Sequence, residues 1–113
     1  ILGYTNYWHQ HEDFTNRQWR YIKAEAEYMK EIGSGVIDVD IETDEIIING
    51  KTNCETFVLN RTVPIVKNYE GQDLTFNFCK TRRLPYDIYV WHLLVFCAGM
   101  INDTDVFSIS RDR

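Results

Sequence analysis

The fold is decided by residues 14–33, which read FTNRQWRYIKAEAEYMKEIG. Thr15 and Gln18 have the spacing of a capping box, in which each side chain satisfies an exposed backbone N–H of the other residue. Phe14 and Trp19 occupy the two positions of a hydrophobic staple at the same point. The segment therefore predicts the start of a helix.

Behind this start, apolar side chains recur at the spacing of one helix face. They are Trp19, Ile22, Ala26 and Met29. Gly33 and Gly35 then supply a stop, because glycine readily adopts the backbone conformations that end helices. We predict an amphipathic helix over residues 16–32.

Outward from this helix, the chain alternates apolar and polar residues in several short runs, the period of a half-buried strand. Strands are predicted over residues 1–9, 37–42, 46–48, 54–61, 74–79 and 106–110. Asn49-Gly50 is a typical type I′ turn pair. Residues 62–73 are predicted to form a loop, since Pro64 interrupts strand pairing.

A second helix is predicted over residues 86–101. Pro85 suits a first turn, where its missing N–H is not needed, and Asp87 favours the same helix end. This helix is apolar on nearly every face, so it needs cover from the sheet and from either the first helix or a second subunit.

These elements predict an α+β fold in which an antiparallel sheet of five to six strands carries two helices as a two-layer sandwich. Residues 1–113 would form a single globular domain, since the length is that of one domain.

The formal net charge of -5 disfavours generic binding to nucleic acids or to anionic membranes. Cys54, Cys79 and Cys97 lie in apolar or strand-like stretches, which is typical of reduced, buried thiols. The uncharged run 88–101 is too short to span a bilayer, and no signal peptide is recognisable. We therefore expect a soluble cytoplasmic protein, located in the host cytoplasm if the protein is viral.

The segment 78–87, FCKTRRLPYD, gathers basic residues between a strand end and a helix start. The candidate ligand-binding residues there are Lys80, Thr81, Arg82, Arg83 and Tyr86. Helix N-termini favour anions, and guanidinium groups bind phosphate or carboxylate in bidentate fashion. The alternative is a solvated basic loop that pairs with the acids of residues 38–45.

Tyr7 and Trp8, with Tyr4, are candidates for an aromatic wall against a flat ligand such as a nucleotide. The alternative is that these rings pack in the core. The sequence does not show whether this wall meets the basic segment.

Other patterns indicate chemistry only weakly. His9 and His11 with Glu12 and Asp13 would suit a metal, as would the alternating acids Asp38, Asp40 and Glu42, but neither set completes a known ligand spacing. Cys79 or Cys97 with His92 would be a nucleophile and base without an orienting third group. We expect no metal, no cofactor and no catalytic residue.

Two motifs resemble a family of small uncharacterised phage and bacterial proteins. The first is GYTxYW at residues 3–8, and the second is FCKT at residues 78–81 followed by PYD at residues 85–87. The resemblance carries no activity. It implies a small intracellular accessory protein that a virus can encode.

The leading hypothesis is a non-enzymatic binding protein, such as a phage-encoded modulator of a host process. It would hold an anionic, nucleotide-like small molecule or an acidic protein surface at the basic segment. One alternative is a small enzyme acting on a nucleotide or phosphoester, with His9 or His11 as acid or base. Another is a homo-oligomeric structural protein.

Overall fold

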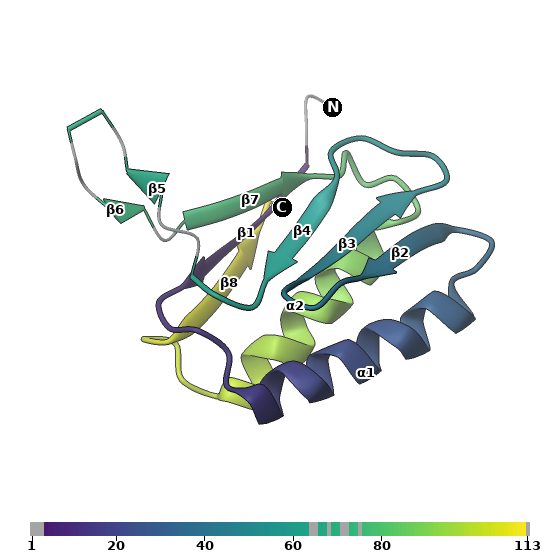
Figure 1. Ribbon diagram of the computed structural model, residues 1–113. Helices are drawn as coiled ribbons and strands as arrows, with labels where there is room; N and C mark the ends of the chain where they lie inside the picture. Colours follow the sequence, from purple (N-terminus) through teal and green to yellow (C-terminus); the bar gives the residue numbers. More distant parts are fainter. Residues whose placement is uncertain (1–3, 64–65, 68, 71–72, 75, 113) are drawn as a thin grey trace.

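The structure of the chain is a computed structural model that describes residues 4–63, 66–67, 69–70, 73–74 and 76–112. Its elements are, in order, β1 (Thr5–Gln10), α1 (Asn16–Ile32), β2 (Ile37–Ile41), β3 (Glu45–Gly50), β4 (Phe57–Asn60), β5 (Val66–Lys67), β6 (Asp73–Leu74), β7 (Phe76–Lys80), α2 (Asp87–Ile101) and β8 (Phe107–Arg111). Figure 1 shows the strands gathered to one side of the two helices, so the predicted α+β class is confirmed.

The strands form two three-stranded antiparallel sheets and a small ribbon. One sheet has the order β7-β1-β8, the other has the order β2-β3-β4, and β5 pairs with β6 in the projecting ribbon (Figure 1). The prediction of a single sheet with five to six strands is therefore wrong.

A contact between Glu55, just before β4, and Lys80, at the end of β7, links the two sheets. The backbone N–H of Glu55 donates to the carbonyl of Lys80 at 3.1 Å. The N–H of Lys80 does not return this bond to the backbone but donates to the Glu55 carboxylate at 2.6 Å. A side-chain bond thus stands where an antiparallel pair would exchange a second backbone bond.

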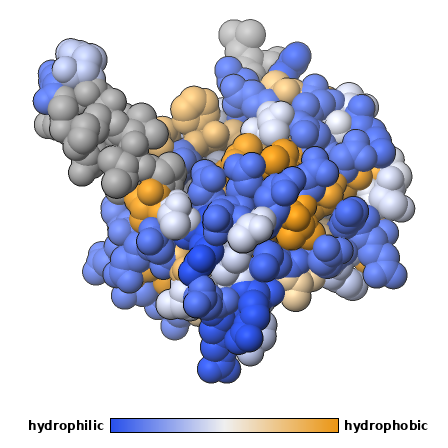
Figure 2. Space-filling model, in the orientation of Figure 1, coloured by the Kyte–Doolittle hydropathy of each residue, from blue (hydrophilic) through white to orange (hydrophobic). Residues whose placement is uncertain are grey.

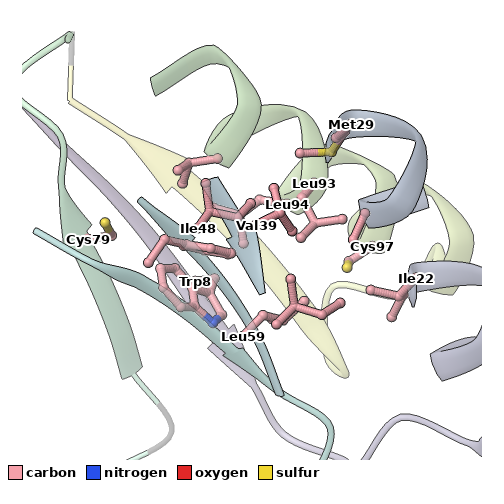
Figure 3. Close-up of a cluster of buried hydrophobic side chains, with 14 of the residues drawn as sticks. Trp8, Ile22, Met29, Val39, Ile48, Leu59, Cys79, Leu93, Leu94 and Cys97 are labelled. Carbon is pink, nitrogen blue, oxygen red and sulfur yellow. The ribbon is translucent and has the colours of Figure 1, made fainter. Parts of the chain in front are cut away.

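The core lies between the strands and the helices. α1 packs against β2, α2 packs against β8, and the two helices contact each other. Figure 3 shows strand residues such as Trp8 and Val39 on one side of the core and Leu93, Leu94 and Cys97 of α2 on the other. All five side chains are buried, so the charge-free helix is covered along this face.

The first helix matches its prediction from Asn16 to Ile32. The Thr15 hydroxyl accepts from the Gln18 N–H, and the Gln18 side chain accepts from the Thr15 N–H at 2.9 Å. The Phe14 and Trp19 rings stack with their centroids 5.9 Å apart. The local signals that predicted this helix are thus confirmed in full.

The predicted turn at Asn49-Gly50 is wrong. Both residues belong to β3, where Asn49 pairs with Asp38 and Gly50 pairs with Ile37. The chain turns later, and the Gly50 N–H donates to the Asn53 side chain at 3.0 Å. The strand continues because the backbone around Gly50 extends the ladder with β2, which outweighs the local preference for a turn.

The stretch predicted as a loop over residues 62–73 contains β5 and the start of β6, while residues 64–65, 68 and 71–72 lie outside the described part. The first strand begins at Thr5 rather than residue 1, and residues 1–3 also lie outside that part. Figure 2 shows mainly hydrophilic side chains on the face in view, with hydrophobic ones in separate patches. Among the described residues, neither helix has the length and apolar character needed to cross a lipid bilayer.

Candidate functional site

The loop between β7 and α2 is tied to the chain segment just before β1. The backbone N–H groups of Thr81 and Arg82 both donate to the Tyr4 carbonyl, at 2.9 and 3.1 Å. Arg82 and Arg83 have φ values of 55° and 56°, in the left-handed region that side chains other than glycine rarely occupy. Two such residues in succession indicate a strained loop that the surrounding contacts hold in place.

Asp87, the first residue of α2, is the buried anion of this region. Its carboxylate accepts from the Asn6 amide at 2.7 Å and from the Thr81 hydroxyl at 2.5 Å. It also forms an ion pair with Arg111 at the end of β8. A buried carboxylate is tolerable only when it is paired and hydrogen-bonded, and these three partners meet that need.

Two guanidinium groups lie against the ring of Tyr4. The Cζ of Arg83 is 4.3 Å from the ring centroid and that of Arg111 is 4.9 Å from it. Arg111 also lies 4.5 Å from the centroid of Trp91. Such cation–π contacts fix the direction of both guanidinium groups without neutralising their charge.

These residues line a cavity with a volume of about 520 Å³ at the start of α2. Its charged and aromatic wall consists of Tyr4, Arg83, Asp87, Tyr89 and Arg111, and its apolar wall of Val36, Leu84, Pro85 and Ile88. Sites for small molecules have this order of size and this mixture of apolar walls with a few fixed polar groups.

The net charge at the cavity is positive. Arg111 is paired with Asp87, whereas no ion pair joins Arg83 to a carboxylate within the described residues. The first turn of α2 adds the positive end of a helix dipole. Tyr86, the N-cap residue, makes no capping bond with its side chain.

The predicted basic residues separate into two groups. Arg83 lines the cavity, whereas Lys80 and Arg82 are exposed and do not line it. Thr81 and Tyr86 are fully buried and have structural contacts: the Thr81 hydroxyl donates to Asp87, and the Tyr86 hydroxyl donates to the Glu55 carbonyl at 2.7 Å.

The predicted pairing of this loop with the acids of residues 38–45 is not seen among the described residues. Asp38 instead pairs with Lys51 at 2.7 Å, and Asp44 lies 3.7 Å from Arg61. Among the described residues, the basic side chains of the loop are therefore not neutralised by the acids of residues 38–45.

Of the predicted aromatic wall, Tyr4 lines the cavity, whereas Trp8 and Tyr7 do not. Trp8 is 3% exposed and packs in the core against Phe57, with centroids 5.1 Å apart. Tyr7 lies on the other face of β1, stacks on Phe76, and donates its hydroxyl to Asp112 at 3.1 Å. Neither ring lines the cavity.

Most cavity residues lie outside the predicted site, Tyr4 and Arg111 among them. Tyr4 belongs to the predicted aromatic wall, and Arg111 belongs to none of the predicted sites. The motif GYTxYW contains Tyr4 at its second position, which is the only local signal for it. No local sequence signal marks Arg111, because its place beside Tyr4 depends on the pairing of Asn6 with Arg111 across β1 and β8.

The two histidines lie away from the cavity. His9 is five residues beyond Tyr4, roughly 16 Å along an extended strand. Its ring lies 5.8 Å from that of His11 and 5.0 Å from that of Phe76. The enzyme hypothesis requires His9 or His11 at the basic cavity, and the structure places neither imidazole there.

Groups of three or more metal-ligating side chains do not occur among the described residues. Cys79 and Cys97 are buried free thiols, and burial raises the pKa of both, to about 12 for Cys79. His92 is exposed and pairs with Glu25 on α1, so it lies apart from the buried Cys97. The arrangement does not activate a thiolate nucleophile.

Comparisons with protein-family models, with curated proteins and with solved structures found no match to this chain. The resemblance to small phage and bacterial proteins therefore stays a prediction. The functional assignment rests on the geometry of the cavity itself.

Proposed function

We propose that the protein is a binding protein that holds an anionic small molecule in the cavity at the start of α2. The observation that carries the proposal is Arg83, whose guanidinium lies on the Tyr4 ring at the cavity wall without a carboxylate partner among the described residues. Because the stacked group is already oriented, little side-chain entropy remains to be lost when it binds an anion.

The anion would be a phosphate or a carboxylate, which match the planar donor geometry of a guanidinium. Asp87 does not repel it strongly, because Asn6, Thr81 and Arg111 already neutralise and enclose that carboxylate. The apolar wall would receive an uncharged, flat part of the ligand, so a nucleotide-like molecule fits the chemistry.

A binding role without catalysis is in keeping with the distance of the histidines and with the raised pKa of the buried thiols. It is also in keeping with the accessory role in a phage or its host that the resemblance implies. An acidic protein surface is the second candidate ligand, and exposed Lys80 and Arg82 favour it.

A thermal-shift panel tests the proposal. Inorganic phosphate, adenosine monophosphate and the carboxylate citrate would be compared on the wild-type chain, on Arg83→Ala and on Arg82→Ala. The two variants are matched, since both arginines are exposed and have positive φ, and only Arg83 lines the cavity. We expect a stabilising ligand whose shift is lost in Arg83→Ala and kept in Arg82→Ala.

If both variants lost the shift equally, the site would be the broad basic surface rather than the cavity. If neither phosphate nor nucleotide shifted the wild-type protein, while an acidic peptide did so through Lys80 and Arg82, the second candidate would replace the first.

A further inference from the structure

The outer side of the helical layer carries two matched rows of exposed side chains. The outer ridge of α2 consists of Ile88, His92, Val95 and Gly99. The outer ridge of α1 consists of Arg17, Arg20, Ala24, Glu27 and Glu31. Each row repeats at three- and four-residue steps, so its members lie along one line of the helix surface.

The ridge of α2 is apolar and remains open to water. Residues 88–101 contain no acidic residue, lysine or arginine. Ile88 is 67% exposed and Val95 is 47% exposed. A Cβ added at Gly99 would meet nothing within 4 Å, so the ridge has a gap at its far end. Exposed apolar side chains aligned on one ridge, here Ile88 and Val95 with His92 between them, are suited to an interaction site.

The ridge of α1 is charged in a self-complementary way. It begins with Arg17 and Arg20 and ends with Glu27 and Glu31. Arg17 and Glu31 each lie seven residues from Ala24, so the two charge types are arranged symmetrically about a small central side chain. A second α1 in antiparallel orientation would place basic ends on acidic ends.

The side chains along the ridge of α2 are also arranged about a central point, here by their size. The pair Ile88 with Gly99 and the pair His92 with Val95 are centred on one point of the helix. In an antiparallel pair of α2 helices, the protruding Ile88 of one copy would fit over the bare Gly99 of the other. Large side chains packed against small ones are what close helix contacts require.

The two centres lie at the same level in the layer. The Glu25 carboxylate, next to Ala24, lies 2.5 Å from the His92 Nε2, and this contact joins the middle of α1 to the middle of α2. Ile32 and Ile88 line one hollow of about 310 Å³ between the helices, so α1 and α2 run antiparallel. One two-fold axis can therefore relate both helices to their copies.

The geometry points to a homodimer in which two copies of this chain pack through the helical layer about that axis. This contact is isologous, since the same surface faces itself, and it closes at two subunits. It also covers the face of α2 that neither sheet nor α1 covers. Ile88 also lines the cavity, so the dimer contact and the ligand site share this side chain.

Exchanging the charges tests this arrangement directly. The acidic-ridge variant carries Arg17→Glu and Arg20→Glu, and the basic-ridge variant carries Glu27→Arg and Glu31→Arg. Each alone should sediment as a monomer at concentrations where the wild-type chain is dimeric, because like charges then face each other. An equimolar mixture of the two variants should recover the dimer, and mass spectrometry should show that each dimer contains one chain of each variant.

The apolar contact is tested by Val95→Glu, with Phe78→Glu as the matched control. Phe78 is 56% exposed but lies on β7, away from the helices. Val95→Glu should raise the dimer dissociation constant by at least about tenfold, whereas the control should leave it unchanged. Neither residue lines the cavity, so ligand binding at Arg83 should persist in both.

Gly99→Leu separates assembly from folding. Leucine favours a helix more than glycine does, so the variant should remain folded by circular dichroism. It should nevertheless weaken the dimer by filling the gap for Ile88. A wild-type chain that is monomeric at every concentration measured would overturn the inference, as would a dimer that the charge exchanges and Val95→Glu leave intact.

Discussion

Asp87 and Arg111 form an ion pair that joins the start of α2 to the end of β8. The Asp87 side chain is 7% exposed and that of Arg111 is 28% exposed, so the pair is largely shielded from water. The same pair fixes Arg111 beside Tyr4, which shapes the wall of the candidate site. The stability of the fold and the shape of the candidate site thus both depend on this ion pair.

Replacing Asp87 by alanine should lower the free energy of unfolding by about 3 kcal/mol or more, because Arg111 would then lose the partner of its partly buried charge. Urea unfolding measures the change. Asp40→Ala is the control, since Asp40 is exposed on β2 and its loss should stay within about 0.5 kcal/mol. Equal effects of the two substitutions would show that the buried pair does not organise the fold.

The strained loop gives a second prediction. Arg82 has a φ of 55°, a conformation that costs roughly 1 kcal/mol in residues with a Cβ. Arg82→Gly should therefore leave the free energy of unfolding unchanged or raise it by up to about 1 kcal/mol. Arg20→Gly in α1 should instead lower it by about 1 kcal/mol, since glycine disfavours a helix interior. A similar loss in both variants would mean that the loop is not strained.

A third prediction concerns a close contact of the backbone with a buried ring. A Cβ at Gly50 would lie 2.7 Å from the Tyr86 ring and 2.4 Å from the Thr52 carbonyl oxygen. Gly50→Ala should destabilise the protein by about 1–3 kcal/mol, the range for overpacking. At Gly35 the added methyl group meets nothing, so Gly35→Ala should be neutral or slightly stabilising. Thermal unfolding of both variants checks the contrast.

The buried thiols and the buried Tyr86 phenol predict a loss of stability in alkaline solution. Burial, helped by the nearby Glu55 charge, raises the pKa of the Cys79 thiol from 9.0 to about 12, and burial raises those of Tyr86 and Cys97 as well. These groups bind their protons more tightly in the folded state than in the unfolded state. Their stabilising contribution is therefore complete below pH about 9 and falls as the pH rises toward 12, by at most about 1.4 kcal/mol per pH unit for each group.

Urea unfolding at several pH values above 9 measures that slope. The Cys79→Ala variant is less stable at neutral pH, but its stability should fall less steeply with pH than that of the wild-type chain. Parallel slopes for the two proteins would contradict the role of the Cys79 thiol.

The sequence predicted those parts of the fold whose causes are local. The predicted first helix agrees with the observed one, and its start was predictable because Thr15 and Gln18 satisfy each other within four positions of the chain. The division into two sheets was not predictable, since it depends on which strands pair, and β1 pairs with β7 and β8 far away in sequence.

The candidate site shows the same limit. Arg83 was predicted from its place beside a helix start, where basic residues and backbone N–H groups both favour anions. Arg111 reaches the same cavity through strand register, and periodicity alone does not reveal which strands pair. Trp8 was misassigned to the ligand wall because alternation along β1 does not tell which face meets the core.

The most direct test of the central claim is an NMR titration of the isotopically labelled chain with inorganic phosphate and then with adenosine monophosphate. We expect the amide signals of residues 83–89 and the side-chain signals of Arg83 and Arg111 to shift together and to saturate, and we expect the Arg83→Ala variant to lose these shifts. Shifts confined to Lys80 and Arg82, or no saturable shift at the cavity with either ligand, would contradict the claim.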